Sequence, residues 1–164
     1  MSFHFRVVNF ILLLLTTVLE ILSLAFIIRI LDTHCVLGEE YGISVWMLIF
    51  VMPPIALQSL VLLLFRLCCT TVGLDPIAMT FNLVSGVACI VAGLTLLVAM
   101  IDHCGNEFAL IFYLSGAFGM IAGILHLVNT CICNVYMPRG EWKYLKPSKR
   151  MKRKATKKKD FNGD

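Results

Sequence analysis

Four polar side chains lie inside long apolar stretches of this sequence and are the residues best placed to do chemistry. Glu20 is the one carboxylate inside such a stretch, and Gln58, Asn82 and His126 lie in three later ones. An ionised group surrounded by hydrocarbon is costly, so a carboxylate there marks a functional site by default. We expect Glu20 to be neutral and hydrogen-bonded across helices. Gating, oligomer specificity and proton or ion coupling are the alternative roles.

Gln58, Asn82 and His126 form a second polar level, each in the same half of its own stretch. If they converge, they hold helices together at ~0.6 kcal/mol each; otherwise a side chain bonds a backbone carbonyl of its own helix. Glu20 is expected at a different depth, level with Ser115 and Cys89.

No combination of residues indicates catalysis or metal binding. The sequence places no nucleophile beside a base and an orienting group. His4, His34, His103 and His126 are scattered, and no cysteine spacing joins them into a metal site. We therefore expect a protein that is not an enzyme and needs no cofactor.

The composition requires a membrane. Of 164 residues, 59% are hydrophobic and only 15% charged, well beyond ordinary soluble domains. Apolar runs cover 7–28, 43–65, 77–101 and 108–135, each close to or above the ~20 residues that span a bilayer. The runs are continuous, without the alternation of a membrane β-barrel. They predict an all-α membrane protein, an antiparallel four-helix transmembrane bundle over 1–136.

The C-terminal segment 137–164 is a basic tail that we expect to be disordered and cytoplasmic. Eleven of the fourteen Lys and Arg follow the last apolar run, and such an excess marks the cytoplasmic side. Both termini are then cytoplasmic, and anionic inner-leaflet lipids are the expected partner of the tail. The residues expected to contact lipid headgroups are Lys149, Arg150, Lys152, Arg153, Lys154, Lys157, Lys158 and Lys159.

The first run has a second interpretation as a cleaved signal peptide. Ser23-Leu24-Ala25 places small residues at a spacing that a cleavage site prefers. The apolar stretch continues to Ile28 and exceeds the usual ~7–15-residue signal core, which favours an uncleaved span.

The seven cysteines divide by compartment under this topology. Cys35 and Cys104 fall one in each outer loop, where an oxidising lumen favours a disulfide between them; two free thiols are the alternative. Four more lie near the cytoplasmic boundary and are candidates for S-palmitoylation, with unmodified packing as the alternative: Cys68, Cys69, Cys131 and Cys133.

Small residues recur every four positions on the last two runs, where they let helices approach closely. We expect them to pack the third run on the fourth, with self-association between copies as the alternative. The residues are Ser85 and Gly93 on the third run and Ser115, Gly116, Gly119 and Gly123 on the fourth. Pro53-Pro54 falls inside the second run and is expected to kink it.

Four spans between Val7 and Val135, short outer loops and a charged cytoplasmic tail resemble MARVEL-type four-pass proteins and the small four-pass proteins of insect septate junctions. The six-residue loop 102–107 is too short for a tetraspanin. The segment 29–42 lacks the Trp and the cysteine pair of a claudin.

The resemblance implies a non-enzymatic protein that organises membrane or cell–cell junctions, through junction assembly, membrane apposition or vesicle traffic. We expect it in the plasma membrane, associating with itself or with other membrane proteins and not with nucleic acid. The alternative is a channel, transporter or accessory subunit that uses Glu20.

Overall fold

The computed structural model describes residues 3–31, 39–68, 75–101 and 109–136. Each range is one α-helix: α1 (Phe3–Leu31), α2 (Glu39–Cys68), α3 (Asp75–Ile101) and α4 (Ala109–Tyr136). Within them, four segments have the length and hydropathy needed to cross a membrane: Val7–Arg29, Gly42–Cys68, Pro76–Met100 and Ala109–Val135. The prediction of an all-helical protein with four membrane spans is confirmed for the described part of the chain.

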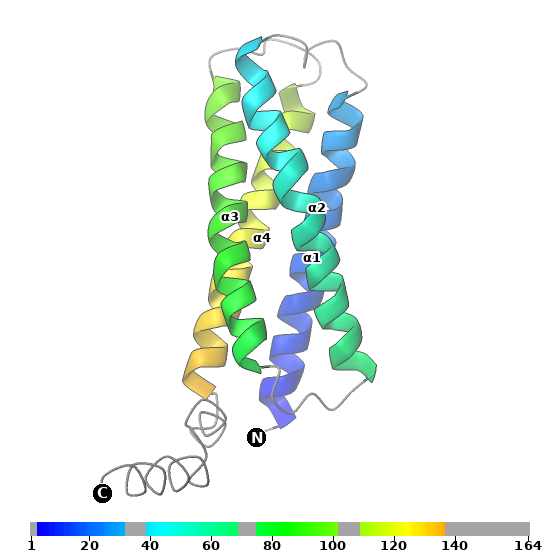
Figure 1. The fold of residues 1–164 in the computed structure, drawn as a ribbon, viewed down its shortest axis with the longest axis vertical. Helices are drawn as coiled ribbons and strands as arrows, with labels where there is room; N and C mark the ends of the chain where they lie inside the picture. The colour runs from blue at the N-terminus through cyan, green and yellow to red at the C-terminus, as the bar shows by residue number, and fades with distance from the viewer. Residues whose placement is uncertain (1–2, 32–38, 69–74, 102–108, 137–164) are drawn as a thin grey trace, which may run out of the picture.

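The helices lie side by side in a ring. Helix α1 packs against α2 and α4, and α3 packs against the same two helices. Figure 1 shows that α1 begins and α4 ends at one end of this arrangement, here called the terminal end. In this ring α4, like α2, is a neighbour of both α1 and α3, so the orientation of α4 governs two helix contacts.

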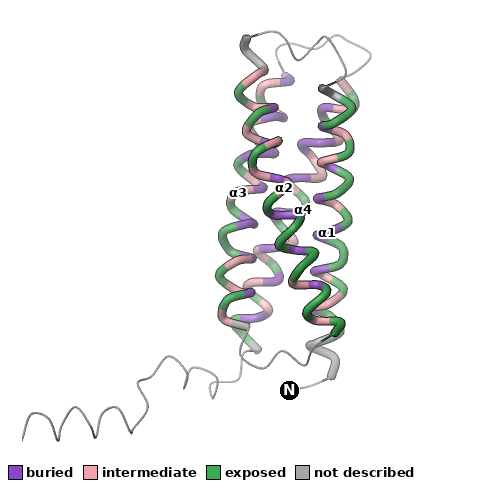
Figure 2. The backbone as a smooth tube through the Cα atoms, turned by 45° about the vertical axis from the view of Figure 1, so that its right-hand side comes forward, coloured by how far each residue is buried: buried purple, intermediate pink, exposed green. Residues whose placement is uncertain are grey.

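Helix α2 continues through Pro53 and Pro54. A proline inside a helix removes one backbone hydrogen bond and crowds the preceding turn, and membrane helices tolerate it where neighbouring groups compensate. Toward the terminal end, α2 and α3 draw apart in both Figure 1 and Figure 2. The contact between α2 and α3 is therefore closest on the other side of the prolines.

The outward surface of the four helices is apolar. Between 33% and 39% of each most apolar window is buried, so most of each span faces outward. Large exposed side chains are almost all hydrocarbon, for example Leu15, Phe50, Val84 and Ile124. Figure 2 shows the buried positions on the facing sides of the helices. Such a surface is stable only where hydrocarbon replaces water.

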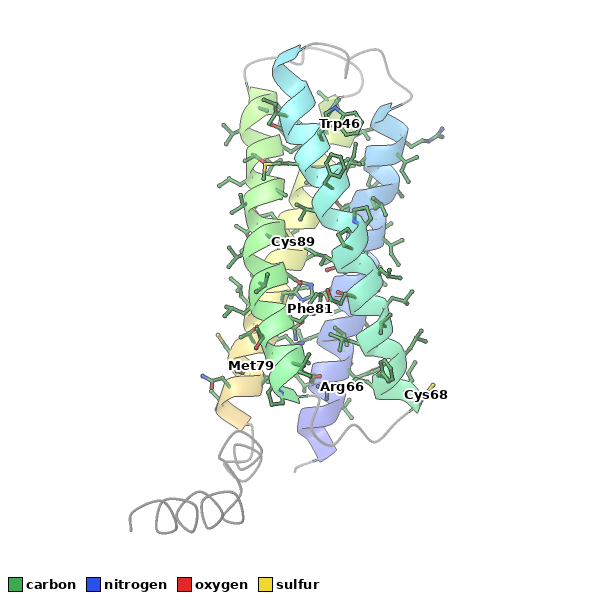
Figure 3. All side chains as sticks on the ribbon, in the orientation of Figure 1. Trp46, Arg66, Cys68, Met79, Phe81 and Cys89 are labelled. Atoms are coloured by element: carbon green, nitrogen blue, oxygen red, sulfur yellow. The ribbon has the colours of Figure 1, made fainter. Side chains whose placement is uncertain are left out.

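The interior changes character along its length. Away from the terminal end it is an apolar core that includes Leu48, Met52, Leu96 and Phe112. Cys89 belongs to this core, with its Sγ 3.8 Å from Met52 Sδ; Figure 3 labels this cysteine on α3. Toward the terminal end, buried polar side chains replace the hydrocarbon.

Glycines set the spacing between α3 and α4. A Cβ on Gly93 would lie 2.7 Å from the carbonyl oxygen of Gly116, and a Cβ on Gly123 would lie 2.7 Å from that of Gly86. Both distances are shorter than real Cβ contacts allow. The two glycine pairs lie seven residues apart on each helix, so the same face is in close contact over two turns.

Gly119 belongs to the same four-residue repeat but points elsewhere. A Cβ there would meet Ser23 Oγ at 3.5 Å and Met52 Cε at 3.8 Å, which are ordinary contacts. The small-residue pattern of α4 therefore serves two faces, one toward α3 and one toward α1 and α2.

This difference gives a matched test. We expect Gly123→Ala to lower the free energy of unfolding in detergent micelles by about 1–3 kcal/mol, the usual cost of overpacking. Gly119→Ala should be neutral or slightly stabilising, because alanine is the better helix former. Equal effects of the two substitutions would contradict the close approach of α3 to α4.

Candidate functional site

One polar side chain from each helix meets in the bundle interior. These four residues are Glu20 of α1, Ser59 of α2, Asn82 of α3 and His126 of α4, and we call them the four-helix polar cluster. His126 Nε2 lies 2.6 Å from Glu20 Oε1, and His126 Nδ1 lies 2.8 Å from Asn82 Oδ1. Ser59 Oγ donates a longer hydrogen bond, 3.3 Å, to the same Glu20 oxygen. All four helices are thus joined through two side chains, Glu20 and His126.

The hydrogen-bond partners indicate where the hydrogens of the cluster lie. Asn82 Oδ1 can only accept, so His126 Nδ1 carries a hydrogen and donates it. A further hydrogen then lies between His126 Nε2 and Glu20 Oε1, on either atom. In one form the pair is imidazolium and carboxylate, and in the other it is imidazole and carboxylic acid. Both forms have zero net charge, which avoids the cost of an isolated charge in hydrocarbon.

The cluster is completely shielded. Glu20 and His126 are both 0% exposed, and Asn82 is 2% exposed. Phe81 packs edge-on against the His126 ring, with centroids 6.1 Å apart. Glu20 Oε2 is the one buried side-chain oxygen or nitrogen among the described residues that has no hydrogen-bond partner. This oxygen is the free acceptor position of the site.

Two further polar contacts join α1 to α4, one on each side of the cluster. Toward the terminal end, Asn9 Nδ2 donates to Asn129 Oδ1 at 2.6 Å and approaches Cys133 Sγ at 3.1 Å. On the other side, Ser23 Oγ donates to the Ser115 carbonyl at 2.8 Å, and Ser115 Oγ donates to the Ser23 carbonyl at 3.0 Å. Both contacts are fully buried.

The structure differs from the sequence expectation at Gln58. Asn82 and His126 do meet, but Gln58 is exposed and the neighbouring Ser59 takes its place in the cluster. Successive residues of a helix point about 100° apart. Of two adjacent residues, one can therefore face the interior and the other the surface. The expected depth of Glu20 also changes, because its partner is His126 and Ser115 lies opposite Ser23.

A regular spacing in the sequence identifies the residues that the sequence interpretation missed. On α1 the buried positions Asn9, Thr16, Glu20 and Ser23 are separated by seven, four and three residues. On α4 the buried positions Ser115, His126, Asn129 and Cys133 are separated by eleven, three and four residues. Intervals of three and four keep side chains on one helix face, so this polar stripe was the available signal for the α1–α4 contact.

The described cysteines fall into two groups. Cys68 and Cys131 are exposed, near the ends of α2 and α4, and Figure 3 shows Cys68 at the end of its helix. Cys89 and Cys133 are buried, and Cys133 lies beside Asn9. Cys35, Cys69, Cys104 and the tail lysines and arginines of 137–164 lie outside the described residues, so the disulfide, the lipidation and the headgroup contacts stay predictions.

The predicted small residues lie at two different helix contacts. Gly93, Gly116 and Gly123 lie between α3 and α4, whereas Ser115 and Gly119 face α1. Ser85 is buried on α3. Among the residues that the structure describes, no group of three or more His, Cys, Asp or Glu side chains is arranged to hold a metal ion.

Comparisons of the chain with protein-family models, with curated proteins and with solved structures found no match.

The Glu20–His126 contact predicts a specific pattern of stability changes. We expect His126→Leu to lower the free energy of unfolding in micelles by about 3 kcal/mol, because it leaves the Glu20 carboxyl buried with Ser59 alone. Glu20→Gln should cost less, about 1 kcal/mol, because the amide nitrogen of glutamine can donate a hydrogen bond to the ring nitrogen Nε2.

The double variant Glu20→Leu/His126→Leu provides the control. Removing both partners of a buried pair costs less than the sum of the two single removals. Additive losses would show that the two side chains do not interact.

Proposed function

We propose that this chain is a non-enzymatic integral membrane protein that organises membrane or cell–cell junctions, through junction assembly, membrane apposition or vesicle traffic. The observation that carries the proposal is the closure of the bundle by its own side chains. The four-helix polar cluster joins all four helices, and the α1–α4 contacts extend that closure to both sides.

A closed bundle with an apolar exterior suits a structural role. Helices that must slide or rotate during transport need alternative partners for their polar groups. Here most buried polar groups are satisfied in one arrangement, and the glycine contacts leave α3 and α4 little freedom to separate. The resemblance to MARVEL-type four-pass proteins favours the same role.

The proposal includes a topology. The bundle is antiparallel in the plasma membrane, both termini are cytoplasmic, and segment 137–164 is disordered and binds anionic inner-leaflet lipids through its lysines and arginines. Lateral association with other membrane proteins or with further copies would then concentrate the protein at contact sites.

Localisation tests this proposal. A C-terminally tagged protein expressed in its native tissue should concentrate at cell–cell contacts, and its tag should be reached by antibody only after the plasma membrane is permeabilised. A variant in which the eight headgroup lysines and arginines of the tail are changed to glutamine serves as a control for the tail alone. Uniform distribution in internal membranes would contradict the junction role.

A second candidate function is proton-coupled transport, favoured by one observation. Glu20 Oε2 is buried without a partner, and Glu20 Oε1 shares a hydrogen with His126. A carboxyl and an imidazole in series can pass a proton between them, and intramembrane Glu and His residues form the proton relays of pumps and transporters.

Proton flux separates the two functions. In liposomes that contain the purified protein and a pH-sensitive dye, the organiser role predicts the same proton leak for the wild type and for Glu20→Gln, at the level of protein-free vesicles. A leak that is raised by the wild type and abolished by Glu20→Gln would favour transport.

A further inference from the structure

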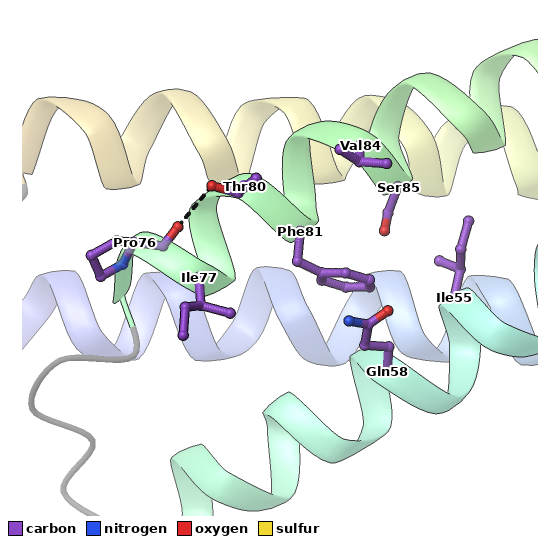
Figure 4. A pocket seen from close by; sticks show the side chains of 8 residues that line it. All are labelled: Ile55, Gln58, Pro76, Ile77, Thr80, Phe81, Val84 and Ser85. Atoms are coloured by element: carbon purple, nitrogen blue, oxygen red, sulfur yellow. Dashed lines mark hydrogen bonds between the residues drawn. The ribbon is translucent and has the colours of Figure 1, made fainter.

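A groove opens sideways between α2 and α3 toward the terminal end. Its volume is about 660 Å³, and its lining is mainly apolar and includes Ile77, Phe81 and Val84. Ile77 and Val84 are 61% and 62% exposed. Figure 4 shows Gln58 on α2 extending into the groove, with Ser85 on the facing wall of α3. The groove therefore contains a primary amide among hydrocarbon side chains.

The Gln58 amide is not satisfied within the described part of the chain. It is exposed, and no hydrogen bond joins it to another residue in the four described ranges. Gln58 lies seven residues before Phe65, the end of the apolar run 43–65, which places it about 10 Å inside that run at 1.5 Å per residue. That depth is well inside a hydrocarbon layer of about 30 Å, where an unsatisfied amide is costly.

Depth restricts what can satisfy this amide. Lipid tails neither donate nor accept hydrogen bonds, and lipid headgroups lie at the bilayer surface, about 10 Å away by the same arithmetic. A polar side chain on another membrane helix reaches the required depth. A carboxamide both donates and accepts, so the amide of a second copy complements it fully.

The small-residue faces that could serve self-association are used within the chain. The glycine contacts of α4 are made with α3 of the same chain, and the serine contacts are made between α1 and α4. Gln58 thus differs from the cluster residues, because its amide is exposed in the groove and has no partner among the described residues.

We propose that two copies of this chain associate in the membrane plane through the groove between α2 and α3, with the two Gln58 amides hydrogen-bonded to each other across a two-fold axis. An interface of this kind uses the same patch on both copies. Each amide donates to the carbonyl oxygen of its counterpart, and the exposed side chains of Ile77 and Val84, which line the groove, pack around the pair.

The inference deepens the proposed function, since it names the partner for lateral association. Full-length protein with donor or acceptor fluorophores on a C-terminal tag is reconstituted in phosphatidylcholine liposomes, and energy transfer is measured as lipid is added. We expect Gln58→Leu to weaken association about tenfold, the size expected for two interhelical hydrogen bonds. Gln58→Asn, which keeps the amide, should retain most of the association.

Two controls identify the face. Ile124→Ala, on the exposed side of α4, should leave association unchanged. The thermal stability of Gln58→Leu in micelles should equal that of the wild type, because the amide has no partner within the described bundle. Wild-type protein that stays monomeric, or a Gln58→Leu dissociation constant equal to that of the wild type, would overturn the inference. With the tagged protein still concentrated at cell contacts, the first result removes self-association, the second removes the Gln58 interface, and both leave the proposed function standing.

Discussion

The hydrogen bond between His126 Nε2 and Glu20 Oε1 is the interaction on which the rest of the bundle depends. In a bilayer, apolar side chains gain little by leaving lipid for a helix interface, so hydrogen bonds and close packing determine which helix faces meet. If Glu20 or His126 faced lipid, a polar or charged group would lie in hydrocarbon, which is costly in free energy. Pairing in the bundle interior avoids this cost. Their contact sets the rotation of α1 and α4, and Asn82 and Ser59 then orient α3 and α2.

Each helix contact has its own physical basis. Helices α1 and α4 are joined by hydrogen bonds at three depths, and α3 and α4 approach closely through paired glycines. Helix α2 is held less firmly in this half of the bundle, where Ser59 contributes its long bond to Glu20. The same helix carries Pro53-Pro54 and the outward Gln58. The least constrained helix is therefore the one that offers a polar group to a partner, which is consistent with a rigid body that associates along one side.

The sequence was sufficient for the helices and insufficient for their rotation. Four apolar runs of spanning length predict four helices because the backbone has no other partner in hydrocarbon. The same composition does not indicate which face of each helix is buried, because lipid and protein interior are both apolar. A soluble helix has a polar face toward water and an apolar face toward the core, and this contrast is absent here. Gln58 and Ser59 illustrate this: adjacent residues exchange roles, and only the packed structure separates them. The pairing of Asn82 with His126 could be predicted from the sequence, because both residues are strongly polar and lie at similar depth. The spacing of Asn9, Glu20 and Ser23 contained the remaining signal.

The most direct test of the central claim is a solid-state NMR dipolar measurement between carboxyl carbon-13 in glutamate and imidazole nitrogen-15 in histidine, on the full chain in liposomes. The geometry, with Nε2 and Oε1 2.6 Å apart, predicts strong dephasing that disappears in Glu20→Leu. Absence of dephasing in the wild type, or dephasing that persists in Glu20→Leu, would show that the two side chains do not meet and that another interaction orients the helices.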